Sequence, residues 1–276
     1  MSDPLPAWSD AFELGRLPPV PQLVLDGPIN REWAIGGSTG AGIKVAIIDS
    51  GIDASHPAVG SVEGAVIIEP DDSEPDGFRV IEGPHTDLYG HGTACAGIIR
   101  SVAPDVSIYS VRVLGERLTG KAWVFATGLE WAIENGMNVV NLSLSTSNEA
   151  HIPMFHELTD AAAFAHVMLV SAMANEPKTT VPSEFSSVFS TASIRSDDPY
   201  EVRYNAAGPA EWAARGVDVD VAWADGSSIT ATGNSFAAPH VAGVIALLLA
   251  KHPGLTTFQV KTILAAMATA PGSVTQ

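Results

Sequence analysis

A serine at the start of a long apolar stretch constrains this chain more than any other feature. Residues 233–251 begin Gly-Asn-Ser-Phe-Ala-Ala-Pro-His-Val-Ala-Gly and continue through valine, isoleucine, alanine and leucine to Lys251. This pattern predicts a buried helix with Ser235 at its N-terminus and Pro239 in its first turn, where a proline costs no intrahelical hydrogen bond. A helix N-terminus favours a developing oxyanion. Simple helix capping is the competing interpretation of Ser235.

Two other stretches place an aspartate and a histidine at the edges of regular elements. Residues 44–48 are almost purely apolar, which is typical of a strand in a parallel sheet covered on both faces. Asp49 follows at the carboxyl end of that strand, where open α/β sheets place their chemistry. His91, within Tyr-Gly-His-Gly-Thr, stands at the start of a predicted helix that runs to about residue 100. Asp49, His91 and Ser235 thus follow one another along the chain.

The three segments resemble the signature motifs of the subtilases, the subtilisin-like serine proteases. The matching motifs are Asp-Ser-Gly at Asp49, His-Gly-Thr at His91 and Gly-Asn-Ser-Phe-Ala-Ala-Pro at Ser235. The resemblance implies an α/β, three-layer subtilisin-like fold with a mainly parallel central sheet and helices on both faces. It also implies a serine endopeptidase in which Ser235 is the nucleophile, His91 the general base and Asp49 the group that orients the histidine.

Further site residues follow from the same resemblance. Asn175 matches the side-chain donor of the family's oxyanion hole, and losing such a donor costs on the order of 10²–10³ in turnover. A turn residue is the alternative interpretation of Asn175. The substrate cleft is expected to be lined by Ser143, Leu144, Ser145 and Ala172.

Several positions depart from the usual subtilase pattern or mark one branch of it. Ser145 stands where the family usually has glycine, and its side chain is expected to narrow the pocket. Ala174 also replaces a usual glycine, which is expected to alter the shape of the cleft. Asn234 replaces the commoner threonine before the nucleophile, and its amide is expected to donate toward the oxyanion. Cys95 matches the cysteine beneath the catalytic histidine of the proteinase K branch, which predicts a buried thiol sensitive to bulky mercurials. Phe236 replaces an oxidisable methionine.

Composition and charge restrict the function classes. A chain of 276 residues can form one large domain. Its net charge of −17 argues against nucleic acid and anionic membranes as partners. One cysteine excludes an intrachain disulfide, and the first residues lack the features of a signal peptide. We therefore expect a cytoplasmic protein that works as a monomer, and the subtilase resemblance implies peptide or protein substrates.

The local composition divides the chain into two parts. Proline-rich residues 1–30 are predicted to form an extended N-terminal arm before a peptidase domain over residues 31–276.

Two segments are candidate metal sites. The acidic residues of 69–87 lack the spacing of a helix-loop-helix calcium site and predict a solvated loop. Asp160 breaks the zinc-protease pattern that begins at His156. No metal and no other cofactor is expected to be required for catalysis.

Calcium is a separate question, because many secreted subtilases carry a calcium-binding loop between the helix that starts at the catalytic histidine and the next strand. Here that helix runs directly into residues 101–105 and then a strand, which leaves no room for the loop. A weaker calcium site elsewhere in the chain remains an alternative.

Three functions are compatible with these sequence features. The first is an endopeptidase that matures a defined intracellular peptide. The second is a macrocyclase or transpeptidase, in which an amine captures the acyl-enzyme; such an enzyme would have an insertion over the cleft, and none is evident. The third is an inactive peptide-binding module on the same fold, which the complete Asp, His and Ser set disfavours.

Overall fold

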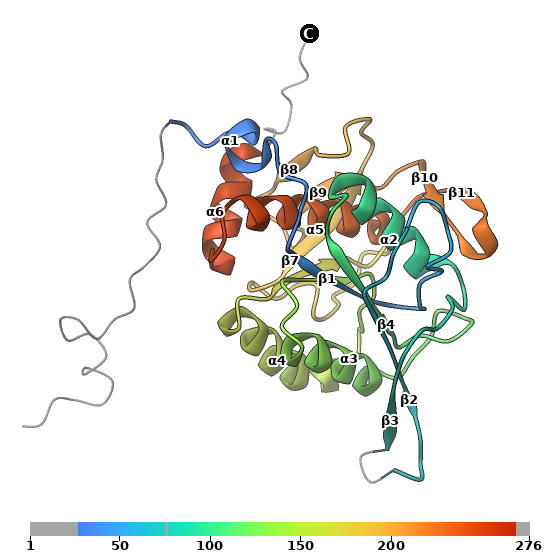
Figure 1. The fold of residues 1–276 in the computed structure, drawn as a ribbon. Coiled ribbons are helices and arrows are strands. Elements are labelled where there is room, and N and C mark those ends of the chain that lie inside the picture. The colour runs from blue at the N-terminus through green and yellow to red at the C-terminus, as the bar shows by residue number, and fades with distance from the viewer. Residues whose placement is uncertain (1–26, 75–76, 269–276) are drawn as a thin grey trace, which may run out of the picture.

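A nine-stranded sheet in the order β3-β2-β4-β1-β5-β6-β7-β9-β8 forms the middle of the molecule (Figure 1). The structure is a computed structural model that describes residues 27–74 and 77–268. The strands are β1 (Lys44–Asp49), β2 (Gly64–Pro70), β3 (Phe78–Glu82), β4 (Ser107–Arg112), β5 (Val139–Leu142), β6 (Met168–Ala172), β7 (Phe189–Ile194), β8 (Val202–Tyr204) and β9 (Trp212–Arg215). The edge strands β3 and β8 pair antiparallel, and the pairings between the other strands are parallel.

Helices cover both faces of this sheet, as Figure 1 shows. One side carries α1 (Arg31–Ile35), α2 (His91–Val102), α5 (Asn234–Lys251) and α6 (Thr257–Met267), and the other carries α3 (Ala122–Glu134) and α4 (Ile152–Phe164). A two-stranded hairpin of β10 (Val219–Ala222) and β11 (Ser228–Ala231) lies beside α2. The short 3₁₀ helices are η2 (Glu149–His151) and η3 (Ala224–Gly226). The predicted three-layer α/β fold is confirmed.

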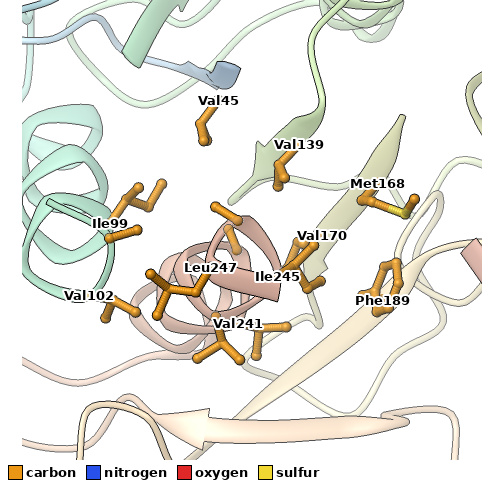
Figure 2. Packing of buried hydrophobic residues seen from close by; sticks show 14 of the residues in the cluster. Val45, Ile99, Val102, Val139, Met168, Val170, Phe189, Val241, Ile245 and Leu247 are labelled. Carbon is orange, nitrogen blue, oxygen red and sulfur yellow. The ribbon is translucent and has the colours of Figure 1, made fainter. Parts of the chain in front are cut away.

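Alternate residues of the central strands feed two separate cores. Val45 and Ile47 of β1 join the cluster around α5, whereas Ala46 and Ile48 join the cluster under α3 and α4. This follows from the strand geometry, since successive side chains point to opposite faces. Figure 2 shows the first cluster, in which Ile245 and its neighbours on α5 lie between α2 and the sheet. Both faces of the sheet are therefore buried, and β1 reads as a continuous apolar run.

Helix α5 is long and apolar enough to cross a membrane, yet 78% of it is buried inside the fold. Every residue from Phe236 to Leu249 is buried. Helices α2 and α1 and strands β5, β6, β7 and β9 all contact it. An all-round apolar helix of this kind is a core helix.

The acidic segment 69–87 differs from the prediction of a solvated loop. Strand β2 extends to Pro70, and β3 pairs antiparallel with it, so the two form a hairpin at the edge of the sheet (Figure 1). Arg79 on β3 forms an ion pair with Glu69 on β2. The hairpin was not predicted because the apolar residues of β3 are half exposed, with Val80 at 44%, and stand between the charged residues Arg79 and Glu82.

The N-terminal part of the predicted arm, residues 1–26, lies outside the described residues. The proposed division at residue 30 stays a prediction. The helix predicted from His91 to about residue 100 agrees with α2, and the buried helix predicted over residues 233–251 agrees with α5.

A buried histidine lies in the middle of α5. His240 is 2% exposed, and its Nδ1 donates to the carbonyl oxygen of Phe236 at 2.9 Å. Burial lowers the pKa of His240 to about 4 from its ordinary value of 6.5, and the nearby Arg215 charge acts in the same direction. The imidazole is therefore neutral in the folded protein at neutral pH.

Acidification is expected to destabilise the fold through His240. The unfolded chain binds this proton near pH 6.5 and the folded chain only near pH 4, so the stabilisation is complete above pH 6.5 and is lost as the pH falls toward 4. The free energy of unfolding is expected to be roughly 2 kcal/mol lower at about pH 5 than at about pH 7.5 through this one group. Denaturant unfolding at both pH values measures it. The free energy of unfolding of His240→Gln should depend less steeply on pH than that of the parent. An equal slope in both proteins would contradict the lowered pKa of His240.

Candidate active site

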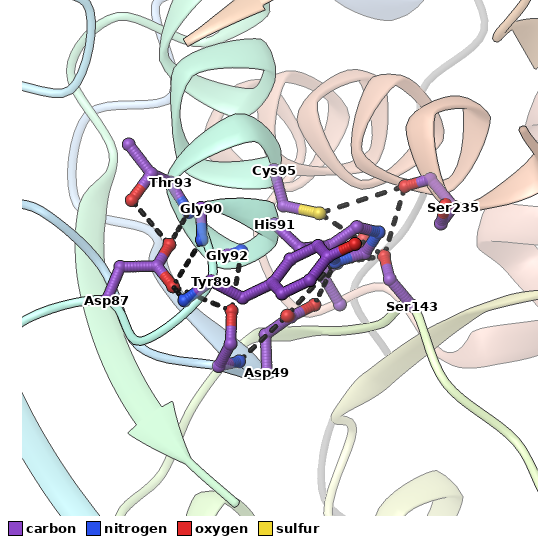
Figure 3. Close-up of polar contacts among 12 residues, drawn as sticks. Asp49, Asp87, Tyr89, Gly90, His91, Gly92, Thr93, Cys95, Ser143 and Ser235 are labelled. Atoms are coloured by element: carbon purple, nitrogen blue, oxygen red, sulfur yellow. Dashed lines mark hydrogen bonds and ion pairs between the residues drawn. The ribbon is translucent and has the colours of Figure 1, made fainter. Parts of the chain in front are cut away.

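The carboxyl ends of β4, β5 and β6 and the N-termini of α2 and α5 meet at one cavity of about 590 Å³. Its lining contains His91, Leu114, Leu118, Ser143, Leu144, Ser145, Thr146, Ser147, Ala172, Met173, Ala174, Asn175, Glu176, Lys178, Thr180 and Ser235. All of the predicted site residues except Asp49 line this cavity. Asp49 lies behind His91, at the end of β1 (Figure 3).

Asp49 and His91 form a buried pair, with Asp49 1% exposed and His91 7% exposed. The Nδ1 of His91 donates to the two carboxylate oxygens of Asp49 at 2.8 and 3.0 Å. The backbone N–H of Ser50 donates to the same carboxylate at 2.8 Å. Burial lowers the pKa of His91, but the Asp49 carboxylate opposes this and, together with Cys95, raises the net pKa well above 6.5. The second ring nitrogen, Nε2, is the one that can exchange a proton on the cavity side.

Glycines allow the two segments of this pair to approach each other. A Cβ on Gly92 would lie 2.0 Å from the carbonyl oxygen of Gly51 and 3.2 Å from the Cβ of Asp49. Gly51 itself has φ of 107°, which side-chain-bearing residues rarely adopt. The glycines in Asp-Ser-Gly and His-Gly-Thr are therefore required for backbone contact between β1 and α2.

Ser235 lies in the first turn of α5, as predicted, but Pro239 does not. Pro239 is in the second turn, so the helix lacks the N–H that would donate to the carbonyl of Ser235. Ser143 supplies a donor from the end of β5, with its Oγ 3.1 Å from that carbonyl oxygen. The Sγ of Cys95 lies 3.7 Å from the same oxygen and 3.4 Å from the Ser143 hydroxyl (Figure 3). Side chains from β5 and α2 thus replace the missing helical hydrogen bond.

Cys95 is fully buried one turn after His91, as expected. Its sulfur, a carboxylate oxygen of Asp49 and a ring nitrogen of His91 all lie within 4.8 Å of one another. Cys95 is covered by the residues that it contacts and does not line the cavity. The expected sensitivity to mercurials stays a prediction.

The two asparagines near Ser235 have different roles from each other. The Oδ1 of Asn175 accepts a hydrogen bond from the backbone N–H of Asn234 at 2.9 Å. This leaves the Nδ2 group as the end of Asn175 that can donate into the cavity. The Asn234 side chain donates to Ala174 and Met173 carbonyls at 3.0 and 3.2 Å and accepts from the Ser193 N–H at 2.8 Å. The expectation that the Asn234 amide donates toward an oxyanion is therefore wrong, because both ends of the amide are engaged.

Ser235 and His91 line the same cavity from different helices. Within residues 27–74 and 77–268 no hydrogen bond joins the Ser235 hydroxyl to the imidazole. Such bonds are often long in unliganded sites and tighten when substrate binds. The site therefore contains the components of an activated nucleophile, which are a serine, a histidine with a raised pKa and a buried carboxylate that contacts the histidine.

Sequence reasoning missed several residues of the cavity wall, among them Leu114, Leu118, Glu176 and Lys178, whereas Thr180 lies in the stretch from Thr179 to Phe185 that was expected to complete the cleft. Leu114 could have been found, because it follows β4, which pairs with β1 and ends at the same edge of the sheet. The position of Lys178 depends on the loop after β6, and no local pattern indicates it.

An arginine side chain binds the connection from α2 to β4. Residues 103–106 carry one carboxylate, that of Asp105, and two of their backbone carbonyls accept hydrogen bonds from this arginine. The Arg100 guanidinium donates to the carbonyls of Pro104 and Val106 at 2.7 Å each, and to those of Val59 and Ser61 at 3.0 Å each. A guanidinium thus joins the two loops here and occupies the oxygens that a cation would need.

Arg100→Ala is expected to lower the free energy of unfolding by about 2 kcal/mol, because four carbonyls lose a charged donor. Arg100→Lys should recover less than half of this loss, since an ammonium lacks the planar fork of a guanidinium. Chemical unfolding of both variants measures the effect. Arg117→Ala, at an exposed arginine, is the control, and a loss no larger than that of the control would contradict the bridging role.

Comparison with known proteins places the chain in a family. Residues 40–275 match the model of the subtilase family. The chain is 33% identical over 255 residues to subtilisin E of Bacillus subtilis (strain 168), an alignment that covers 86% of this chain and 63% of that protein. It is also 33% identical over 255 residues to subtilisin of Bacillus pumilus, covering 86% of this chain and 87% of the relative.

A solved structure agrees with these relatives. The crystal structure of a cold adapted subtilisin-like serine proteinase matches with a TM-score of 0.66 and 28% identity, over 83% of each chain. The chain belongs to the subtilase family.

Proposed function

We propose that this protein is a serine endopeptidase that hydrolyses peptide bonds through Ser235, His91 and Asp49. The observation that carries the proposal is the buried Asp49–His91 pair, joined at 2.8 Å, behind a cavity that Ser235 lines from a helix N-terminus. Membership of the subtilase family supports it. The role proposed for each residue follows from the chemistry of its side chain.

In this mechanism the neutral imidazole of His91 takes the hydroxyl proton of Ser235 through Nε2. The serine oxygen then forms a bond to the substrate carbonyl carbon, and the carbonyl π electrons move to its oxygen. Asp49 holds Nδ1 as the protonated nitrogen and stabilises the imidazolium that forms. His91 next gives its proton to the departing amine as the C–N bond breaks. Water, deprotonated by the same histidine, then hydrolyses the acyl-enzyme.

The oxyanion of the tetrahedral intermediate is proposed to accept hydrogen bonds from the Nδ2 of Asn175 and the backbone N–H of Ser235. Fixed donors of this kind are effective because they need no reorganisation as the charge develops. Anchoring of the Asn175 Oδ1 by the Asn234 N–H supports this role, since it fixes the orientation of the amide. Ser143, Leu144, Ser145 and Ala172 are proposed to contact the substrate, because they line the same cavity.

For the biological setting, we propose a cytoplasmic enzyme that matures a defined peptide and works as a monomer. The support is compositional. The net charge of −17 disfavours nucleic acid and anionic membranes as partners, and one cysteine leaves no disulfide that would need an oxidising compartment. The proposed reaction needs no cofactor, and the occupied carbonyls around Arg100 support independence from calcium at the α2–β4 connection.

A fluorophosphonate probe tests the activated nucleophile directly. Intact mass of the labelled parent is expected to show one adduct, and Ser235→Ala should show none, because the probe reacts with an activated serine oxygen. Ser147→Ala removes another serine of the cavity wall and should label like the parent. A folded parent that forms no adduct would contradict the peptidase and favour a peptide-binding module. Hydrolysis products in the presence of an added amine distinguish hydrolysis from transpeptidation.

The pH profile tests the pairing of His91 with Asp49. Only the neutral imidazole accepts the serine proton, and its pKa is raised above 6.5. The acid limb of kcat/KM is therefore expected above pH 6.5. Asp49→Asn should move this limb to lower pH and reduce kcat by about 10⁴-fold. Asp53→Asn, at a neighbouring acid that does not contact His91, is the control and should change neither the acid limb nor kcat. An acid limb at the parental pH in Asp49→Asn would contradict the pairing of His91 with Asp49.

A further inference from the structure

Asp87 accepts five hydrogen bonds at the junction between β1 and α2 (Figure 3). Its Oδ1 accepts from the Ser50 hydroxyl at 2.8 Å and from the N–H groups of Tyr89 and Gly90 at 2.9 and 2.8 Å. Its Oδ2 accepts from the N–H and the hydroxyl of Thr93 at 2.9 and 2.6 Å. An ionised carboxylate accepts hydrogen bonds and donates none, so every partner here matches its chemistry.

The two hydroxyls that donate to Asp87 extend the network into both catalytic segments. Ser50 Oγ accepts from the N–H of Gly92 at 3.3 Å. The hydroxyl of Thr93 accepts from the N–H of Asp53 at 2.9 Å. Ser50 and Thr93 are both fully buried. Asp87 is therefore the common acceptor that connects the loop after β1 to the first turn of α2.

This network also replaces the ordinary cap of α2. The N-cap residue is Gly90, which has no side chain and makes no side-chain cap. The carboxylate of Asp87 accepts from the N–H groups of Gly90 and Thr93 instead, and a negative charge at this end of a helix is favourable. His91 is the first residue of α2, so the direction of its side chain depends on how this turn is held.

We propose that Asp87 is a positioning residue that holds the His91 imidazole on the Asp49 carboxylate. Ser50 and Gly92, the residues next to that pair, are tied to each other and to Asp87 through one hydroxyl. Asp87 does not line the cavity, so it acts on the geometry of the pair and not on substrate binding. The inference rests on the proposed peptidase activity and adds a residue that the triad itself does not include.

Asp87→Asn tests the role with almost no change of shape. The new NH₂ group must replace either Oδ1, which accepts from three donors, or Oδ2, which accepts from two. At least two of the accepted hydrogen bonds are therefore lost. We expect kcat to fall on the order of 10²-fold, as for a small misplacement of a catalytic group, with KM changed by less than about twofold. Asp71→Asn is the matched control, since Asp71 accepts from the N–H and hydroxyl of Ser73 in a turn remote from the cavity.

A second pair of variants guards against a loss of folding. Thr93→Val removes the hydroxyl that donates to Asp87 and keeps the shape, whereas Thr93→Ser keeps the hydroxyl. We expect kcat to fall in Thr93→Val and to be restored in Thr93→Ser at unchanged KM. Thermal unfolding of each variant confirms that it is folded. Equal kcat in Thr93→Val and Thr93→Ser, or parental kcat in Asp87→Asn, would overturn the proposal.

A measurement independent of turnover separates this proposal from the peptidase assignment. The Nδ1 proton of His91, shared with Asp49, should give a far-downfield proton resonance in the parent. Asp87→Asn should weaken or shift this resonance, and Asp71→Asn should leave it unchanged. If the parent neither hydrolyses peptides nor reacts with a fluorophosphonate, the proposed function fails, and this resonance still decides the positioning role. An unaltered resonance in Asp87→Asn would refute it.

Discussion

The site depends on a carboxylate that is buried beside a histidine. Asp49 is 1% exposed, and an unpaired charge in such a position would cost several kcal/mol. Its oxygens are satisfied by the His91 imidazole and the Ser50 N–H, so the orientation of the histidine and the stability of the carboxylate are the same requirement. The pair also explains why the pKa of His91 is raised although burial alone would lower it. Folding this region therefore holds His91, the proposed general base, in one defined tautomer.

The architecture brings this pair and the serine together. Parallel strands end at the same edge of a sheet, so β1 and β5 present Asp49 and Ser143 side by side, and two helices begin at that edge with His91 and Ser235. Each helix packs on the sheet through a nearly continuous apolar surface. The core thus fixes the backbone, and polar contacts at the edge set the side-chain directions.

Local motifs were sufficient to predict some features and not others. Asp49, His91 and Ser235 could be found because each stands where an apolar periodicity begins or ends beside a glycine. The direction of the Asn234 amide could not, since it is set by Ser193 and the Ala174 carbonyl, far away in the sequence. The β2–β3 hairpin was missed because β3 is an edge strand whose apolar residues are largely exposed and stand among charged residues. Asp87 lay inside a segment interpreted as a solvated acidic loop, and only its five donors distinguish it from the other acids there.

Pro239 shows how the structure compensates for an irregularity next to the proposed nucleophile. A proline in the second turn of α5 removes one helical hydrogen bond and leaves the Ser235 carbonyl without its usual donor. An unsatisfied buried carbonyl costs about 1–3 kcal/mol, so the site needs a replacement. Ser143 provides it, and the Ser143 hydroxyl is itself a hydrogen-bond acceptor for Asn141 on β5 at 2.9 Å. The first turn of α5 is consequently held by the sheet edge as well as by its own helix, and Ser235 is fixed relative to the strands that form the cavity wall.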